Sequence, residues 1–360
     1  MRGLQGLPVN GSLLSEQCLV STGKFLPVVH PEEANVVRIA CYNPAGENIV
    51  TCRDNRKAKF LAEVEGLALN TVLESEVCSL DSYIPIYDFR TLDQALQANS
   101  NVVGLNLSSI LRSAIREKAG IFVPQKIVFR DSLDIAKLCK QKKVILFLSG
   151  PDALIEWVWY NREICNLFTQ LQRMNFYAVT GFNFSVFGGE CPFAHALNQK
   201  RSLYSSMLIR QHGLRTIPHV YAINKCHITR YQKWLSENPD VQLITINCQL
   251  QRSERDISQV VQSVSEFLVR NPCLHVLLQG FCLNEATRFG ALLDRIHFAD
   301  AKPTKYGQSF RRLDLASSDG PNAVTGDIRD YKSLVAYNVE VRRWEVDCIK
   351  REVGNVPKAS

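Results

Sequence analysis

The sequence lacks several features that would assign it to a specialised class. Its twelve cysteines include no Cys-x-x-Cys pair, and no run reaches the roughly 18 apolar residues of a membrane span. No secretory hydrophobic segment follows Met1. It also contains no Gly-x-Ser-x-Gly elbow, no His-Glu-x-x-His pair and no cysteine triplet for an iron-sulfur cluster. These absences predict a reduced, cytoplasmic protein without a membrane anchor, and they disfavour the hydrolase, zincin and radical-enzyme classes that such motifs mark.

The chain has only a mild excess of positive charge. The chain has 42 Lys and Arg residues against 35 Asp and Glu residues, a formal net charge of +7. This bias permits a polyanionic partner but is weaker than that of dedicated nucleic-acid-binding domains. Hydrophobic residues make up 46% of the chain and charged residues 21%, which is enough apolar material for a sizeable core.

One pattern recurs along the chain: a short apolar run, a polar residue at its end, and then an amphipathic helical period. Eight such runs begin near Tyr83, Val102, Val144, Phe176, Thr216, Val241, Leu274 and Ile296. Strands that alternate with helices form parallel sheets through right-handed crossovers, and eight strands close a barrel. The sequence therefore predicts an α/β fold, a (β/α)8 TIM-like barrel. An open doubly wound sheet is the alternative.

The positions of the eight predicted strands divide the chain into three parts. Residues 1–80 form an N-terminal extension, with a hairpin predicted over 36–52 and a helix over 59–75. Residues 81–313 form the barrel, and 314–360 form a linker and a C-terminal helix.

Two further segments need separate interpretations. A helix is predicted from Ser108 to Lys118, and residues 121–130 fit either an inserted hairpin or a strand interrupted by Pro124. The C-terminal helix, predicted over Asp327–Val353, carries apolar residues on one side and Arg342 and Arg343 on the rest. It fits a helix that closes the barrel, a surface for a protein partner or a nucleic-acid-binding helix.

Polar residues end nearly every predicted strand. In a barrel of this kind the carboxyl ends of the strands converge on one mouth, where catalytic residues lie. The carboxylates predicted there are Asp88, Asp152 and Asp300. The residues predicted to bind substrate are Asn106, Asn183, Asn224, Asn247, Gln279 and Lys302. Amides suit the edge of a nucleobase or a sugar, although Asn also caps strands and helices without any ligand.

Basic and sulfur-containing residues follow the same strand ends. Lys305, Arg311, Arg312 and Arg201 are the predicted contacts for a phosphate backbone. Cys191, Cys226, Cys248 and Cys282 lie at or after strands four to seven. Such a cluster is compatible with zinc, but its ligands would come singly from separate loops, so we predict no metal or other cofactor.

The run Ile296-His-Phe-Ala-Asp-Ala-Lys-Pro-Thr-Lys-Tyr-Gly307 resembles a segment of queuine tRNA-ribosyltransferases, also called tRNA-guanine transglycosylases. That family has a (β/α)8 barrel, and the aspartate of this segment attacks the sugar C1′ so that one base replaces another. The resemblance implies that Asp300 is the nucleophile and Asp88 the second carboxylate. The family's zinc motif is absent, which points to relatives that modify DNA with deazaguanine bases.

A second resemblance covers the middle of the chain. The stretch from Gly189-Glu-Cys-Pro192 through Arg201 to His219 is similar to an uncharacterised barrel family of phages and mobile elements, which implies a fold and no activity.

Three functions stay open at this point. The first is a transglycosylase-like enzyme that modifies a base in DNA or RNA through a carboxylate nucleophile. The second is a noncatalytic barrel that binds nucleic acid or, through its C-terminal helix, a protein partner in a mobile-element, phage or defence system. The third is a hydrolase or lyase acting on a sugar or nucleotide.

Overall fold

The computed structural model describes residues 61–71, 73, 79–111, 115–118, 121–124, 129–130, 132–186, 192–313 and 330–354. The predicted hairpin over 36–52 lies outside these residues. Residues 61–63 are helical, but the predicted helix over 59–75 does not continue, because Glu65 and Gly66 both adopt positive φ angles, of 59° and 88°.

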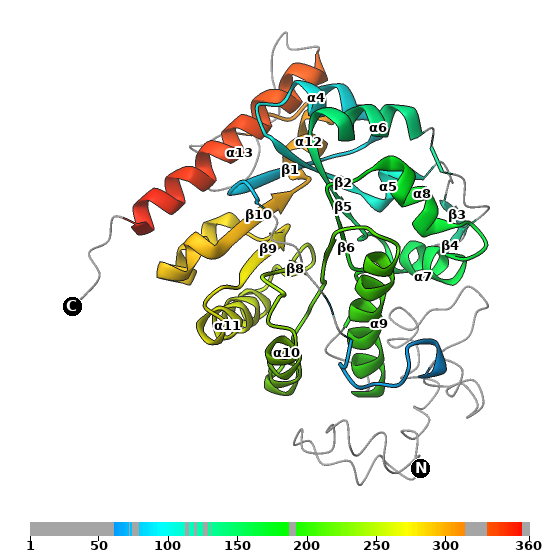
Figure 1. Ribbon diagram of the computed structural model, residues 1–360. Helices are drawn as coiled ribbons and strands as arrows, with labels where there is room; N and C mark the ends of the chain where they lie inside the picture. Colours follow the sequence, from blue (N-terminus) through cyan, green and yellow to red (C-terminus); the bar gives the residue numbers. More distant parts are fainter. Residues whose placement is uncertain are drawn as a thin grey trace.

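The eight predicted strands form one parallel sheet that curls into a nearly closed barrel (Figure 1). They are β1 (Tyr83–Tyr87), β2 (Val102–Asn106), β5 (Lys143–Phe147), β6 (Ala178–Thr180), β7 (Thr216–Ile217), β8 (Leu243–Asn247), β9 (His275–Gln279) and β10 (Ile296–Asp300). The order β7-β6-β5-β2-β1-β10-β9-β8 follows the chain around the barrel. The predicted (β/α)8 TIM-like barrel is therefore confirmed.

The sheet closes between β7 and β8 beyond the end of the short strand β7. His219 pairs with Thr245, and two backbone hydrogen bonds join the strands there: Thr245 N to Pro218 O at 2.8 Å and Val220 N to Thr245 O at 3.0 Å. Strand β7 is thus short in its regular part, while the chain continues along the barrel wall toward the mouth.

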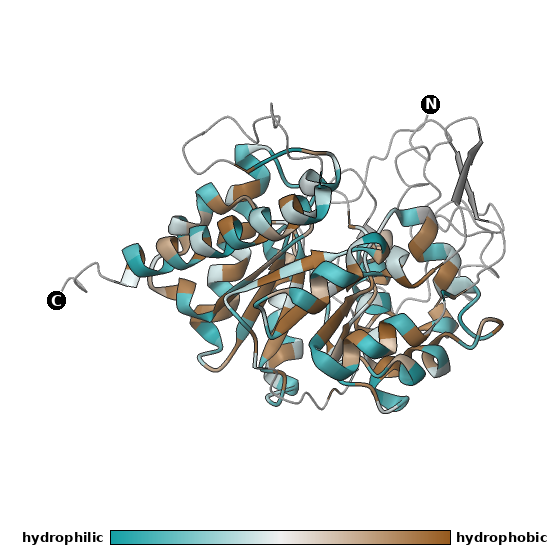
Figure 2. Ribbon diagram, turned by 90° about the horizontal axis from the view of Figure 1, so that it is seen from above, coloured by the Kyte–Doolittle hydropathy of each residue, from teal (hydrophilic) through white to brown (hydrophobic). Residues whose placement is uncertain are grey.

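Helices lie between the strands and cover the outside of the barrel, with polar faces outward and apolar strands inside (Figure 2). They are α4 (Leu92–Gln97), α5 (Leu107–Ile110), α6 (Ser132–Gln141), α7 (Asp152–Tyr160), α8 (Leu167–Met174), α9 (Pro192–Gln211), α10 (Lys225–Glu237), α11 (Glu254–Arg270) and α12 (Lys302–Gln308), with 3₁₀ segments η2 (Phe89–Thr91) and η3 (Leu283–Arg295).

An antiparallel hairpin interrupts the alternation after β2. Its strands are β3 (Ile115–Lys118) and β4 (Ile121–Pro124). The prediction of a helix from Ser108 to Lys118 is wrong, because α5 ends at Ile110 and residues Ile115–Lys118 form strand β3. The hairpin interpretation of the segment from residue 121 is correct in kind, with Pro124 at the end of an edge strand, where proline costs no ladder hydrogen bond.

Side chains alternate between two cores because successive strand residues point to opposite faces. One buried cluster fills the barrel interior and includes Ile84, Ile86, Phe147, Leu277 and Ala299. The other lies between the strands and the surrounding helices. This alternation decides which polar residues at the strand ends reach the mouth.

The interior is filled tightly at Gly104 on β2. A Cβ atom there would lie 2.7 Å from the Phe147 ring and 2.9 Å from an Ile86 side-chain carbon. We expect Gly104→Ala to lower the free energy of unfolding by about 1–3 kcal/mol through overpacking, measured by urea denaturation. Combining it with Phe147→Leu should restore part of the loss. An unchanged stability in Gly104→Ala would mean that the barrel interior has room at this layer.

The C-terminal helix α13 (Tyr331–Gly354) packs along α12 and η3. The buried Asn338 side chain accepts a hydrogen bond from Leu313 N at 2.8 Å and donates one to Arg311 O at 2.9 Å. The helix therefore covers the side of the barrel next to β10 and β1 (Figure 1). Trp344 on the outer face of α13 is 53% exposed, and the protein partner suggested for this helix stays a prediction.

Candidate functional site

A cavity of about 490 Å³ opens at the carboxyl ends of the strands, the position predicted for the site. It is lined by Asp88, Asn106, Ser108, Ser149, Gly150, Pro151, Asp152, Asn183, Ser185, Val186, Tyr221, Asn247, Gln249, Leu250, Gln251 and Lys305. The lining is dominated by amides and hydroxyls, with two carboxylates and one lysine. Such a surface suits a ligand that both donates and accepts hydrogen bonds.

A larger cavity, of about 730 Å³, lies elsewhere, between α4 and the start of α13. Its charged lining residues are Asp93, Lys137, Asp330, Lys332 and Glu340, from the helical layer. We place the candidate site at the mouth because residues at or after the carboxyl ends of seven of the eight barrel strands line the cavity there.

Gln279 connects two of the residues at the bottom of the cavity, Asn106 and Ser149. Its Nε2 donates to Ser149 Oγ at 2.9 Å and lies 3.4 Å from Asn106 Oδ1, so residues from β9, β5 and β2 are joined. Gln279 itself is 1% exposed. It therefore acts beneath the cavity as a support for Asn106 and Ser149. Asn247 is also held, since its Oδ1 accepts from Gln249 N at 3.0 Å.

Asp152 is the most perturbed acid in the mouth. It begins α7, and its Oδ1 accepts a hydrogen bond from Ser185 Oγ at 2.5 Å. Burial raises the pKa of Asp152 to about 6, and the Ser185 hydrogen bond only partly opposes that rise. A carboxyl group with this pKa is present in both protonation states near neutral pH, as a general acid or base requires.

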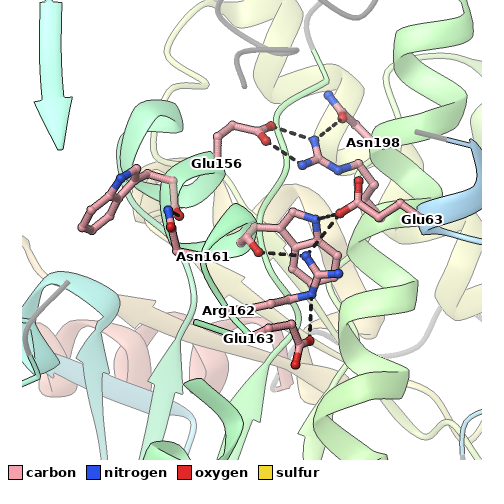
Figure 3. Close-up of polar contacts among 9 residues, drawn as sticks. Glu63, Glu156, Asn161, Arg162, Glu163 and Asn198 are labelled. Carbon is pink, nitrogen blue, oxygen red and sulfur yellow. Dashed lines mark hydrogen bonds and ion pairs between the residues drawn. The ribbon is translucent and has the colours of Figure 1, made fainter. Parts of the chain in front are cut away.

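A chain of buried contacts runs from the Asp152–Ser185 pair into the layer between α7 and α9. Asn198 Nδ2 donates to Ser185 O at 2.8 Å, and Arg201 lies 3.3 Å from Asn198 Oδ1. The Arg201 guanidinium then makes two hydrogen bonds to Glu156, of 2.7 and 2.6 Å. The contacts of Glu156 and Asn198 can be followed in Figure 3. Burial raises the pKa of Glu156 to about 7 although Arg201 opposes it.

A second ion pair, between Arg162 and Glu63, lies at the carboxyl-terminal end of α7. Arg162 lies 3.3 Å from Glu63 of the N-terminal segment and stacks over the Trp159 ring at 4.1 Å (Figure 3). Because Trp159 Nε1 also donates to Glu63, the N-terminal segment is tied to α7. The helix that begins with Asp152 is thereby fixed at both of its ends.

Asp88 is the second carboxylate of the mouth. Gln308 Nε2 donates to both of its oxygens, at 2.8 and 2.9 Å, and Arg90 N donates to Oδ1 at 2.9 Å. Asp88 therefore caps η2 and is tied to α12, so its orientation is fixed.

Asp300, predicted as a catalytic carboxylate of the mouth, is not among the described residues that line the cavity. It follows Phe298 by two positions, so it lies on the outer side of β10 and does not line the cavity. Its Oδ2 lies 3.8 Å from Arg342 on α13, and its Oδ1 accepts from Lys302 N at 2.8 Å. Burial raises the pKa of Asp300, with Arg342 opposing.

Three other predicted residues also lie away from the cavity. Asn224 caps α10, where its Oδ1 accepts from His227 N at 2.9 Å. Lys302 is exposed, with its Nζ 5.4 Å from the centroid of the Tyr306 ring. Arg201, predicted to bind a phosphate backbone, is 3% exposed and bound to Glu156, so it is closed to nucleic acid.

Tyr221 is the principal residue that the sequence did not reveal. The run Thr216–Asn224 suggested a strand ending at Asn224, whereas β7 ends at Ile217 and the wall continues irregularly through His219. Tyr221 then lines the cavity, and its hydroxyl accepts from Gln251 Nε2 at 2.6 Å. Burial raises the pKa of Tyr221, which keeps it a neutral hydroxyl. The signal in the sequence was the two-residue spacing of positions 217, 219 and 221, which places Tyr221 on the same face of the barrel wall as Ile217.

The sulfur residues do not assemble a metal centre among the residues that the structure describes, where no three His, Cys, Asp or Glu side chains gather. Cys191 lies outside the described residues. Cys248 is buried, and burial raises the pKa of its thiol, while Cys226 and Cys282 are partly exposed. His195 and His227 pack edge to face, with ring centroids 5.1 Å apart, and burial lowers the pKa of His227 to about 3.

No protein family model matches the chain, and no curated protein is significantly similar to it. Within the described residues, no helix has the length and apolar character needed to cross a membrane.

Proposed function

We propose that the barrel mouth is the active site of a hydrolase or lyase in which Asp152 exchanges a proton with a ligand of the sugar or nucleoside class. The observation that carries this proposal is the half-buried Asp152 carboxyl, held by Ser185 at 2.5 Å, with a pKa of about 6. Asp88, fixed by Gln308, supplies a second carboxylate in the same cavity. Two carboxyl groups in different environments are the usual equipment for acid-base catalysis.

The rest of the lining supports this ligand class. Asn106, Asn183 and Asn247 offer paired donors and acceptors, and the Tyr221 hydroxyl adds another. Lys305 is the single cation among the described residues that line the cavity. A ring with several hydroxyl or amide groups would match this surface better than an apolar ligand.

The proposal is tested by ligand-dependent thermal stability followed by turnover. Free bases, nucleosides, pentoses and hexoses are added to the wild type, and each compound that raises Tm is then incubated and analysed for products. Asn247→Ala should lose the Tm shift, whereas Asn161→Ala, on the far end of α7, should keep it. Stabilisation by none of these compounds would reject the ligand class.

Nucleic acid is a second candidate ligand, favoured by the basic residues that continue from the mouth. Lys305 lines the cavity, while Lys302, Arg311 and Arg312 are exposed beside it on and after α12. Arg312 also packs against Tyr337, with its guanidinium carbon 4.5 Å from the ring centroid. Base exchange of the transglycosylase type would then need Asp88 as its nucleophile, because Asp300 lies on the outer side of β10.

Salt-dependent binding to labelled tRNA, duplex DNA and single-stranded DNA separates this candidate. We expect Arg311→Ala combined with Arg312→Ala to weaken binding about tenfold and to reduce its salt dependence, because two phosphate contacts are lost. Exchanging Lys233 and Arg288 for alanine removes the same charge from α10 and η3 and should leave binding unchanged. Absence of binding to all three nucleic acids would remove this candidate and leave the small-ligand proposal in place.

A further inference from the structure

The larger cavity, of about 730 Å³, lies in the helical layer, away from the mouth. It is bounded by α4 and by the first half of α13, two helices that lie side by side in Figure 1. Leu96, Ala336 and Val339 give it apolar walls, and Tyr337 adds an aromatic ring that is 38% exposed. Its volume is within the range of small-molecule sites, so it has room for a flat ring.

Gln94 places a buried amide on the wall of this cavity. It lies on the inner face of α4 together with Leu92 and Ala95. The side chain is 6% exposed, and its Oε1 atom has no hydrogen-bond partner in the described part of the chain. A buried polar atom left unpaired destabilises the folded state. The terminal torsion of glutamine is soft, so the amide can turn its edge to a ligand that supplies the missing donor.

The charged groups of the cavity are paired or exposed. Asp93 on α4 lies 3.8 Å from Lys332 on α13, and Glu340 accepts from Arg343 at 3.0 Å. The third carboxylate, one residue before α13, accepts from two backbone N–H groups of that helix. Lys137 is exposed, so solvent and salt screen its charge. The cavity therefore favours a neutral ligand over a charged one.

We propose that this cavity binds a small aromatic molecule that carries a primary carboxamide. A carboxamide presents an N–H donor beside a carbonyl acceptor, so it pairs edge to edge with the Gln94 amide. Tyr87, which also lines the cavity, adds a neutral hydroxyl because burial raises its pKa. The apolar walls then enclose the ring. The proposal rests on the cavity and on Gln94, so it stands whether or not the mouth is catalytic.

The test is calorimetric titration of the full chain with nicotinamide. The matched compound is 3-acetylpyridine, which keeps the ring and the carbonyl group but has no N–H donor. We expect nicotinamide to bind and 3-acetylpyridine to bind about tenfold more weakly, the loss of one buried hydrogen bond. Equal affinities would mean that only the ring is recognised and would overturn the proposal, as would the absence of nicotinamide binding.

A substitution at Gln94 tests the amide itself. Gln94→Leu keeps much of the side-chain size but removes the amide, so it should weaken nicotinamide binding about tenfold. Without ligand, its Tm should equal or exceed that of the wild type, because an unpaired buried group is removed. A lower Tm would show that Gln94 stabilises the free protein and would contradict the proposal. Gln141→Leu, at an exposed position of α6 outside the cavity lining, should leave the affinity unchanged.

Asn247→Ala, in the mouth, separates the two cavities. Nicotinamide binding that survives Asn247→Ala and falls in Gln94→Leu supports the cavity between α4 and α13. The reverse result would assign nicotinamide to the mouth and overturn the proposal. Neither result affects the acid-base role proposed for Asp152, which is tested by turnover.

Discussion

Replacing Arg201 by methionine is expected to lower the free energy of unfolding by about 3–5 kcal/mol, one of the largest effects of any single substitution in the barrel. The reason is the environment of its partner. Glu156 is 5% exposed and receives two hydrogen bonds from Arg201, so removing the guanidinium leaves a buried carboxyl group without its counter-charge. Urea denaturation at pH 8, above the pKa of about 7 of Glu156, would measure the loss.

Two further variants separate the ion pair from simple loss of packing. Replacing both partners, as in Glu156→Leu with Arg201→Met, should recover most of the stability, because apolar side chains carry no desolvation cost. Arg288→Met removes an arginine from an exposed pair with Glu254, of 2.9 Å, and should cost no more than about 1 kcal/mol. A loss in Arg201→Met as small as that in Arg288→Met would contradict the importance assigned to the buried pair.

The fold was predictable from the sequence because its signal is local and repeated. Each buried parallel strand requires a continuous apolar run, such as Val144–Leu148, and each crossover requires an amphipathic helix such as α11. Repetition makes the prediction robust, since one misjudged element, such as the helix placed over β3, leaves the count of eight unchanged.

The candidate site was predictable only in part because its members depend on side-chain direction. Asp300 and Asp88 both follow apolar runs, yet a difference of one position sends Asp300 to α13 and Asp88 to the mouth. Arg201 looked like a surface cation within a basic helix, and its burial follows from Glu156, which lies 45 positions earlier in the chain. Such long-range pairing leaves no periodic trace in one sequence.

Asp152→Asn is expected to separate stability from function. Folding raises the pKa of Asp152 from 3.8 to about 6, so the unfolded chain releases this proton at lower pH than the folded protein does. The free energy of unfolding therefore falls as pH rises from about 4 to 6 and then stays lower. Asparagine cannot ionise, so the variant should be more stable than the wild type by about 1–3 kcal/mol at pH 8 and equally stable near pH 3.

The same substitution should abolish turnover of any ligand found for the mouth, because asparagine cannot exchange a proton. Greater stability together with lost activity is the signature of a residue held in an unfavourable state for function. Asp240→Asn, an exposed position just before β8, is the matched control and should change stability by no more than about 0.5 kcal/mol at either pH. If Asp152→Asn were less stable than the wild type at pH 8, the carboxylate would instead be a structural acceptor for Ser185, and the catalytic role proposed for it would be wrong.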